Sequence, residues 1–142
     1  MKFVRWRYAK EPIQQSALRD LERYFYVSLP PLYKEIMLNH NGARPFPNFY
    51  LTRKGEERLI KSFLPIQHGH PDDLLTVYRR LKNLLPKKVV PFANDDFGNY
   101  ICLDYQESAN PKVKLWEHEA QSETLEDVAD DFNKWMSTLY IR

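Results

Sequence analysis

Two groups of residues have the types that metal or acid–base chemistry needs. The first group is His68 and His70, which flank Gly69, with Asp72 and Asp73 directly after them. Imidazole and carboxylate groups can hold a metal ion when their geometry is compatible. However, Asp72 and Asp73 stand where a helix is expected to begin, and acidic side chains there match the helix dipole. We therefore interpret this segment as a helix start and expect no metal site.

The second group is Asp95, Asp96 and Asp104. Paired carboxylates can hydrolyse a bond when they face each other at a defined separation. Asp95 and Asp96 are accounted for by a turn, and Asp104 shares a strand face with Tyr100 and Cys102. The chain also contains no Walker loop, GxGxxG, nucleophile elbow or HExxH. We expect a non-catalytic protein without a cofactor.

Two further segments mix aromatic and charged residues. Residues 116–119 read Trp-Glu-His-Glu, and Trp is enriched at protein interfaces. The alternative is that Trp116 belongs to the core and His118 only ends a strand. Near the N-terminus, Arg5, Arg7 and Lys10 alternate with aromatics, as in proteins that bind single-stranded nucleic acid. This basic run is short and the second half of the chain is acidic, so we expect no direct nucleic-acid binding.

The net charge of +2 hides an uneven distribution. Residues 1–71 carry +6 and residues 72–142 carry −4. Between Asp95 and Asp131 there are 11 acidic residues against two lysines, a local net charge of −9. Such a window should attract a basic partner by long-range electrostatics. The simpler interpretation, a solvated acidic face that only aids solubility, remains open.

The residues that could contact a partner are positioned by a predicted hairpin over 88–105. Val89, Val90 and Phe92 favour a strand, and Asn94 to Asp96 favour a turn. From Asn99 onward apolar and polar positions alternate, so one face of the hairpin must be covered.

Other elements follow from apolar periodicity and from turn residues. We expect strands near 3–8, 49–52, 59–66 and 113–118, a loop over most of 43–58, and helices from Ser16, from Pro31 to Asn41, from Pro71 to Leu85, and from a Thr124 cap to Leu139. Strands in the middle and helices at both ends predict an α+β fold, with a mainly antiparallel sheet of about five to six strands and helices packed against it.

Length and composition set the remaining limits. The 142 residues suit a single domain over 1–142, and 20 aromatic residues favour a packed core. Cys102 is the only cysteine, and its place in a strand predicts a buried, inert thiol. No segment resembles a secretory signal or a membrane span, so we expect a cytoplasmic protein with no membrane association.

Three segments together resemble the SUKH superfamily of bacterial immunity proteins and fungal cell-wall regulators. They are SLPPLYKEIMLNHNG (Ser28–Gly42), VVPFANDDFGNYICLDY (Val89–Tyr105) and PKVKLWEHE (Pro111–Glu119). The sequence departs from the family pattern at Ala43 and Phe97, where a glycine is common. The resemblance covers about Ser28 to the C-terminus.

The resemblance implies a SUKH-like domain that binds a protein and catalyses nothing. The expected function is that of an immunity protein, which neutralises a cognate toxin. That toxin is expected to be of the nuclease type and therefore basic. The alternative is a scaffold or regulatory module without a toxin partner. We expect a monomer or weak homodimer, with partner-binding residues Asp95, Asp96, Asn99, Trp116, Glu117, His118 and Glu119.

Overall fold

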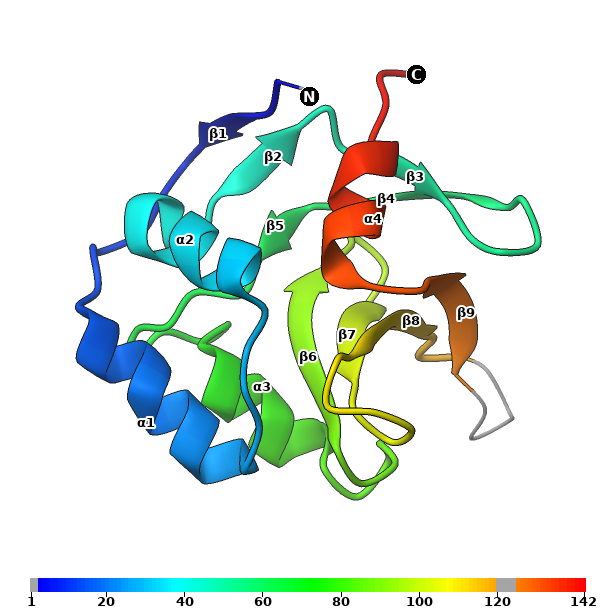
Figure 1. The fold of residues 1–142 in the computed structure, drawn as a ribbon. Helices are drawn as coiled ribbons and strands as arrows, with labels where there is room; N and C mark the ends of the chain where they lie inside the picture. The colour runs from blue at the N-terminus through cyan, green and yellow to red at the C-terminus, as the bar shows by residue number, and fades with distance from the viewer. Residues whose placement is uncertain (1–2, 120–124) are drawn as a thin grey trace.

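The computed structural model describes residues 3–119 and 125–142 (Figure 1). Its elements are β1 (Arg5–Arg7), α1 (Gln15–Phe25), α2 (Pro31–His40), β2 (Arg44–Phe46), β3 (Phe49–Leu51), β4 (Glu57–Leu59), β5 (Ser62–Phe63), α3 (Leu74–Leu81), β6 (Val89–Asn94), β7 (Tyr100–Asp104), β8 (Lys112–Trp116), β9 (Glu126–Ala129) and α4 (Phe132–Thr138). The Thr124 cap predicted for the closing helix lies outside the described residues.

The main sheet is antiparallel and has five strands in the order β5-β6-β7-β8-β9. Two ribbons, β1-β2 and β3-β4, extend it on either side. The Phe63 N–H of β5 donates to the Ala43 carbonyl just before β2, and the Arg53 N–H donates to Asp127 of β9. These bonds join each ribbon to one edge of the main sheet. The predicted α+β architecture, an antiparallel sheet with helices against it, is therefore confirmed.

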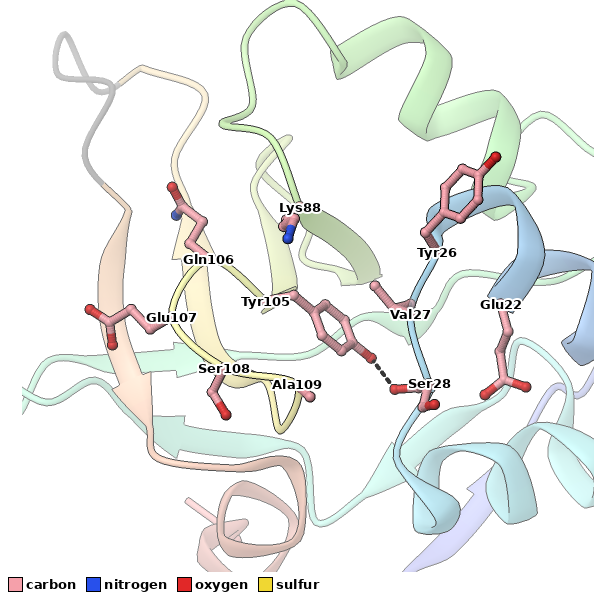
Figure 2. Close-up of a pocket in the computed structure, with 10 residues that line it drawn as sticks. All are labelled: Glu22, Tyr26, Val27, Ser28, Lys88, Tyr105, Gln106, Glu107, Ser108 and Ala109. Carbon is pink, nitrogen blue, oxygen red and sulfur yellow. Dashed lines mark hydrogen bonds between the residues drawn. The ribbon is translucent and has the colours of Figure 1, made fainter.

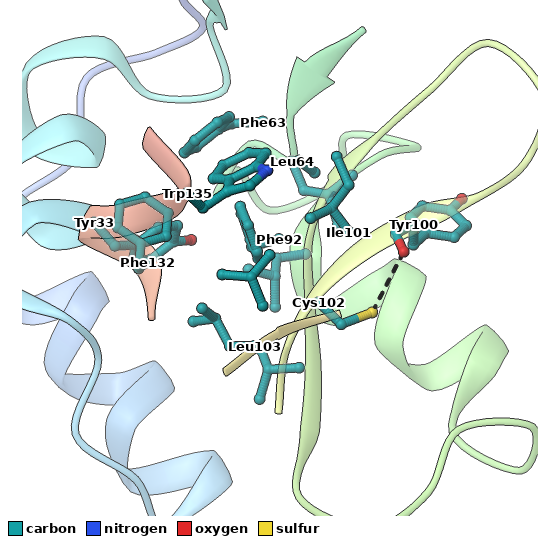
Figure 3. Close-up of a cluster of buried hydrophobic side chains, with 14 of the residues drawn as sticks. Tyr33, Phe63, Leu64, Phe92, Tyr100, Ile101, Cys102, Leu103, Phe132 and Trp135 are labelled. Carbon is teal, nitrogen blue, oxygen red and sulfur yellow. Dashed lines mark hydrogen bonds between the residues drawn. The ribbon is translucent and has the colours of Figure 1, made fainter. Parts of the chain in front are cut away.

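The hairpin at the centre of the sheet is β6–β7. Its register runs from Val89 opposite Asp104 to Asn94 opposite Tyr100, with one bulge near Pro91. All residues of both strands are buried. Figure 3 shows Ile101 and Leu103 directed toward α4 while Cys102 points toward α3. Both faces of the hairpin are thus covered, where the sequence required cover on one.

The core on the α4 face is a cluster of aromatic rings. Trp135 and Phe132 of α4 meet Phe63 and Phe92 of the sheet, with ring centroids 5.3 to 6.3 Å apart. Tyr33 of α2 closes the cluster 5.8 Å from Phe132 (Figure 3). Mostly edge-to-face rings at these distances stabilise a core beyond simple area burial.

The two helices expected near the N-terminus are confirmed as α1 and α2, with one correction. Pro31 is the first residue of α2, and Gly42 after its end has φ +66°. A side chain at Gly42 would also approach Pro65 to within 2.7 Å, so both backbone and space favour glycine. The first helix does not start at Ser16, because α1 begins at Gln15 and Ser16 lies within its first turn. Gln14 occupies the N-cap position, and its side chain makes no capping hydrogen bond.

The predicted closing helix is too long at its start. Residues 126–129 form strand β9, and the helix begins at Phe132, where the Asp131 carboxylate accepts from the Lys134 N–H. Val113 pairs with Ala129 and Lys114 with Asp127, so one residue of β9 bulges out. A bulge breaks strict alternation, and here it places Val128 and Ala129 inward in succession. With two buried positions in succession, the spacing of apolar residues resembles that of an amphipathic helix.

Three other boundaries also differ from expectation. The strand expected near 49–52 is confirmed as β3, but the rest of the supposed loop 43–58 also contains β2 and the start of β4, and the expected strand over 59–66 is reduced to Ser62–Phe63. Pro45 fits in β2 because short peripheral strands tolerate a missing N–H. The third helix begins at Leu74 because Asp73 caps it, through a bond from the Thr76 N–H. It ends at Leu81, ahead of Pro86.

Candidate functional site

The turn between β6 and β7 is organised by the carboxylate of Asp95. Asp95 Oδ1 accepts from the N–H of Phe97 at 2.7 Å and of Asn99 at 3.0 Å. Its Oδ2 accepts from Asn99 Nδ2 at 2.8 Å. Gly98 supplies the positive φ of +83° that lets the chain reverse. Asp95 is therefore occupied by its own turn, whereas its neighbour Asp96 is exposed.

Asn99 joins this turn to the end of β8. Its side-chain oxygen accepts from the His118 N–H at 2.8 Å. Tyr100 lies opposite Trp116 in the sheet, with ring centroids 6.2 Å apart, and Trp116 lies 6.2 Å from the His118 ring. The two segments predicted to contact a partner, far apart in sequence, are thus adjacent in space.

The site around the Asp95 turn and the end of β8 also includes residues that the sequence analysis did not single out. A pocket of about 330 Å³ is lined by Asp95, Asn99 and Glu117 together with Arg58 of β4 and Arg142 near the C-terminus. Arg58 was missed because its segment was interpreted as a loop. The available signal was Lys54-Gly55 between two short runs, FYL and ERL, which is a hairpin pattern.

The Arg58 guanidinium lies among several carboxylates. Its Nη2 lies 2.7 Å from Glu56, 3.7 Å from Glu117 and 3.9 Å from Glu126. Burial raises the pKa of Glu126, and a hydrogen bond with the Glu117 carboxyl raises it further, while Thr52 opposes the shift. We define the acidic corner by its carboxylates, Asp95, Asp96, Glu56, Glu57, Glu117, Glu119 and Glu126.

The carboxylates of the acidic window are less free than their number suggests. Lys114 lies 3.4 Å from Asp104 and 3.1 Å from Asp127. The Arg53 guanidinium, hydrogen-bonded to Asp130 at 2.7 Å, lowers the pKa of that carboxyl. Arg53 and Arg58, from the first half of the chain, thus pair with three carboxylates of the acidic window: Asp130, Glu117 and Glu126.

Two acidic residues of the corner stay largely unpaired. Asp96 has a single basic neighbour, Lys61, at 4.0 Å, and the Asp96 side chain is 48% exposed. Glu119 is exposed and has no ion pair or hydrogen bond with any residue the structure describes. Glu123, also in the acidic window, lies outside the described residues. Asp96 and Glu119 are the corner carboxylates most available to a partner.

The groups considered for catalysis do not converge. Asp104 lies at the end of the β6–β7 hairpin opposite to the Asp95 turn. His70 accepts the Asp72 N–H at 3.0 Å, and Asp73 caps α3. In the described parts of the chain no three His, Cys, Asp or Glu side chains are placed to hold a metal ion. Cys102 is fully buried, and burial raises the pKa of its thiol.

A wider pocket of about 670 Å³ lies away from the acidic corner, and none of the predicted site residues lines it (Figure 2). This pocket lies between the α1–α2 connection and the loop after β7. Tyr105 stands between them, and its hydroxyl donates to the Ser28 carbonyl at 2.8 Å. The Glu22 carboxylate on its wall is used internally, since it accepts the Leu29 N–H at 2.7 Å.

Comparison with known proteins gives the class of protein. The family model described as SMI1 / KNR4 family (SUKH-1) matches residues 12–138, so the chain belongs to this family. A relative from Bacillus subtilis (strain 168), an SPbeta prophage-derived uncharacterized protein, YokK, is 23% identical over 120 residues. That match covers 72% of this chain and 60% of the relative. None of the described helices is both long and apolar enough to cross a membrane.

Proposed function

We propose that this protein is an immunity protein, which binds a basic toxin domain through the acidic corner and blocks it without catalysing a reaction. The family includes both immunity proteins and regulators, which makes protein binding the common property. The observation that carries the proposal is the position of Asp96 and Glu119. Both are exposed carboxylates at one corner with little internal pairing.

Electrostatics supports this choice of partner. A nuclease toxin must be basic where it grips phosphates. Exposed carboxylates can occupy the same basic residues and accelerate encounter, an effect that weakens with salt. Trp116 is half-buried beside His118, so it can contribute apolar contact at the rim of the acidic corner.

The corner is also built to keep its shape. Asp95 fixes the turn, Asn99 ties that turn to β8, and Arg58 holds Glu56 and Glu117. Charged groups held in place by other bonds lose little freedom when a partner arrives. We place the protein in the cytoplasm as a monomer or weak homodimer.

A second candidate is a regulatory or scaffold module of the kind for which the SMI1/KNR4 family is named. The family match supports this candidate as much as the first, because it does not distinguish immunity proteins from regulators. The acidic corner would then bind a basic segment of a cellular protein rather than a toxin.

Co-expression tests the proposal. The chain is produced together with the protein encoded beside it, as wild type and as Asp96→Lys/Glu119→Lys. Wild type should restore growth and co-purify with a toxic neighbour, and the variant should bind at least about tenfold more weakly at low salt. Asp20→Lys/Glu35→Lys is the matched control, because it changes the net charge equally at exposed helical positions.

Each outcome has a distinct meaning. Failure of wild type to rescue growth or to bind a toxic neighbour excludes the immunity function. Equal weakening by both double variants would mean that only net charge matters and that the acidic corner is not the contact.

A further inference from the structure

Strand β1 is an open sheet edge. It pairs with β2 on one side and stands at the outside of the molecule on the other (Figure 1). By contrast, the Phe63 N–H of β5 donates to the Ala43 carbonyl, Asp127 of β9 accepts from the Arg53 N–H, and β3 bridges to Tyr140. No backbone bond from another described segment closes the outer edge of β1. An open edge presents unpaired N–H and C=O groups that can pair with an added strand.

One face of the β1-β2 ribbon is crowded with guanidinium groups. Arg5 and Arg7 share this face, Arg44 lies directly opposite Arg7, and Phe46 lies opposite Arg5. The other face is committed to the core, because Trp6 stacks on His40 at 5.5 Å and contacts Phe63 at 5.2 Å. Trp6 therefore anchors the ribbon to the core, while the arginines lie on the opposite face.

These arginines lack counter-ions. Like charges directly opposite each other on a sheet are destabilising. Among the residues the structure describes, no carboxylate lies within 4.0 Å of Arg5, Arg7 or Arg44, whereas Arg53 and Arg58 are both paired. The Nε–H of Arg44 is buried and finds no acceptor there either. A buried donor without an acceptor is uncommon. An anion on this face would balance the charges of the arginines and accept a hydrogen bond from the Arg44 Nε–H.

The same face has a hollow with aromatic walls. A pocket of about 320 Å³ is lined by Arg7, Tyr8, Arg44, Pro45, Phe46 and Asn48. Tyr8 is 69% exposed and Phe46 is 46% exposed, so both rings are available for contact. Arginine forks flanked by exposed rings suit a carboxylate with an apolar neighbour.

We propose that the β1 edge binds an acidic segment of a protein partner, which adds as an extended strand beside β1. Alternate side chains of an added strand point to the same face. Carboxylates at every second position would therefore reach the face that carries Arg5, Arg7 and Arg44. This binding mode combines main-chain pairing with side-chain selection. The surface has the opposite charge to the acidic corner and does not depend on the function proposed there.

Two other occupants fit less well. A second copy of this chain paired edge to edge through β1 would bring its own arginines close, so the edge disfavours self-association. Single-stranded nucleic acid is usually bound along a track of about 4–16 nucleotides. Here the three arginines span only a three-residue strand pair.

A synthetic probe tests the β1 proposal. The full chain is titrated with a labelled peptide of about eight residues that alternates Glu and Thr, a length suited to a strand. Binding is measured by anisotropy, and the added strand is detected as slower amide exchange of Arg5, Trp6 and Arg7. The control ligands are the same peptide with Gln for Glu and an oligothymidylate of about eight nucleotides.

Matched variants assign the binding to this face. Arg7→Glu/Arg44→Glu should weaken the acidic peptide at least about tenfold, and Arg7→Gln/Arg44→Gln should weaken it by a smaller factor. The control Arg19→Glu/Arg79→Glu makes the same change of net charge on exposed helical surfaces and should weaken it by less than about threefold. The Gln variant guards against a folding defect, which far-UV circular dichroism would reveal.

The supporting result is tight binding of the Glu peptide, protection of the β1 amides, and loss of both in the two Arg7/Arg44 variants only. The proposal is overturned if the Gln peptide binds as well as the Glu peptide or if the β1 amides stay unprotected. Tighter binding of oligothymidylate would assign the face to nucleic acid. Peptide-independent dimerisation lost in Arg7→Gln/Arg44→Gln would assign it to self-association.

Discussion

Replacing Asp95 by alanine should destabilise the fold although the residue lies in a surface turn. Its carboxylate accepts three hydrogen bonds, two from backbone N–H groups and one from the Asn99 side chain. Asn99 in turn holds the His118 N–H at 2.8 Å. The substitution therefore loosens the turn and its connection to β8 together.

The size of the loss follows from these bonds. A hydrogen bond contributes about 0.5–1.5 kcal/mol net, and more when one partner is charged. Asp95 is only half-buried, so water replaces part of each lost bond. We expect a total loss of about 2 kcal/mol in the free energy of unfolding. For a chain of this length that corresponds to a fall of about 6–8 °C in Tm.

Thermal and urea unfolding of Asp95→Ala and Asp96→Ala measure this difference. Asp96 is the matched control, because its closest basic partner is Lys61 at 4.0 Å, and its loss should cost no more than about 0.5 kcal/mol. Similar stabilities of the two variants would refute the role given to Asp95. They would also mean that the turn does not hold the acidic corner in shape.

Three further predictions concern the core and the pH response. Gly42→Ala should cost about 2 kcal/mol or more, because the new Cβ would meet Pro65 at 2.7 Å. Gly69→Ala, with a similar φ but open space around it, should cost about 1 kcal/mol in urea unfolding, and equal losses would contradict the packing argument. The Cys102 thiol should react with a disulfide reagent only as fast as the protein unfolds, since burial raises its pKa and blocks access, and rapid labelling of the native chain would show otherwise. The pKa of Glu126 is raised in the folded state, so the folded chain binds more protons and this group's contribution to stability falls as pH rises through that pKa. The stability of wild type relative to Glu126→Gln should therefore decrease as the pH rises above the ordinary glutamate pKa of about 4.3, and a constant difference would refute the assignment.

The sequence predicted the centre of the fold better than its periphery. The β6–β7 hairpin was recognisable because β-branched residues flank a turn-forming Asn-Asp-Asp, and both signals are local. Strand β9 was not recognisable, because the bulge at Val128 and Ala129 depends on pairing with β8. The start of α1 was likewise not recognisable, because Gln14 occupies the N-cap position without a side-chain capping bond, and Gln is not a typical N-cap residue.

The candidate site was predicted in part. The sequence indicated Asn99 and residues 116–118, and pairing of β7 with β8 brings them together. Arg58 was missed because its place depends on the fold around β3-β4, and loop-like composition concealed that ribbon. Charge counting along the chain also overstated the acidic field, since Arg53 and Arg58 approach the acidic half only in three dimensions.

The most direct test of the central claim is the dissociation constant between this protein and the toxic domain encoded beside it, measured by calorimetry at low and high salt. We expect binding that weakens with salt and that Asp96→Lys/Glu119→Lys weakens by at least about tenfold, with Asp20→Lys/Glu35→Lys close to wild type. Tight binding that ignores both salt and the Asp96/Glu119 substitutions would contradict the claim that the acidic corner contacts a basic partner.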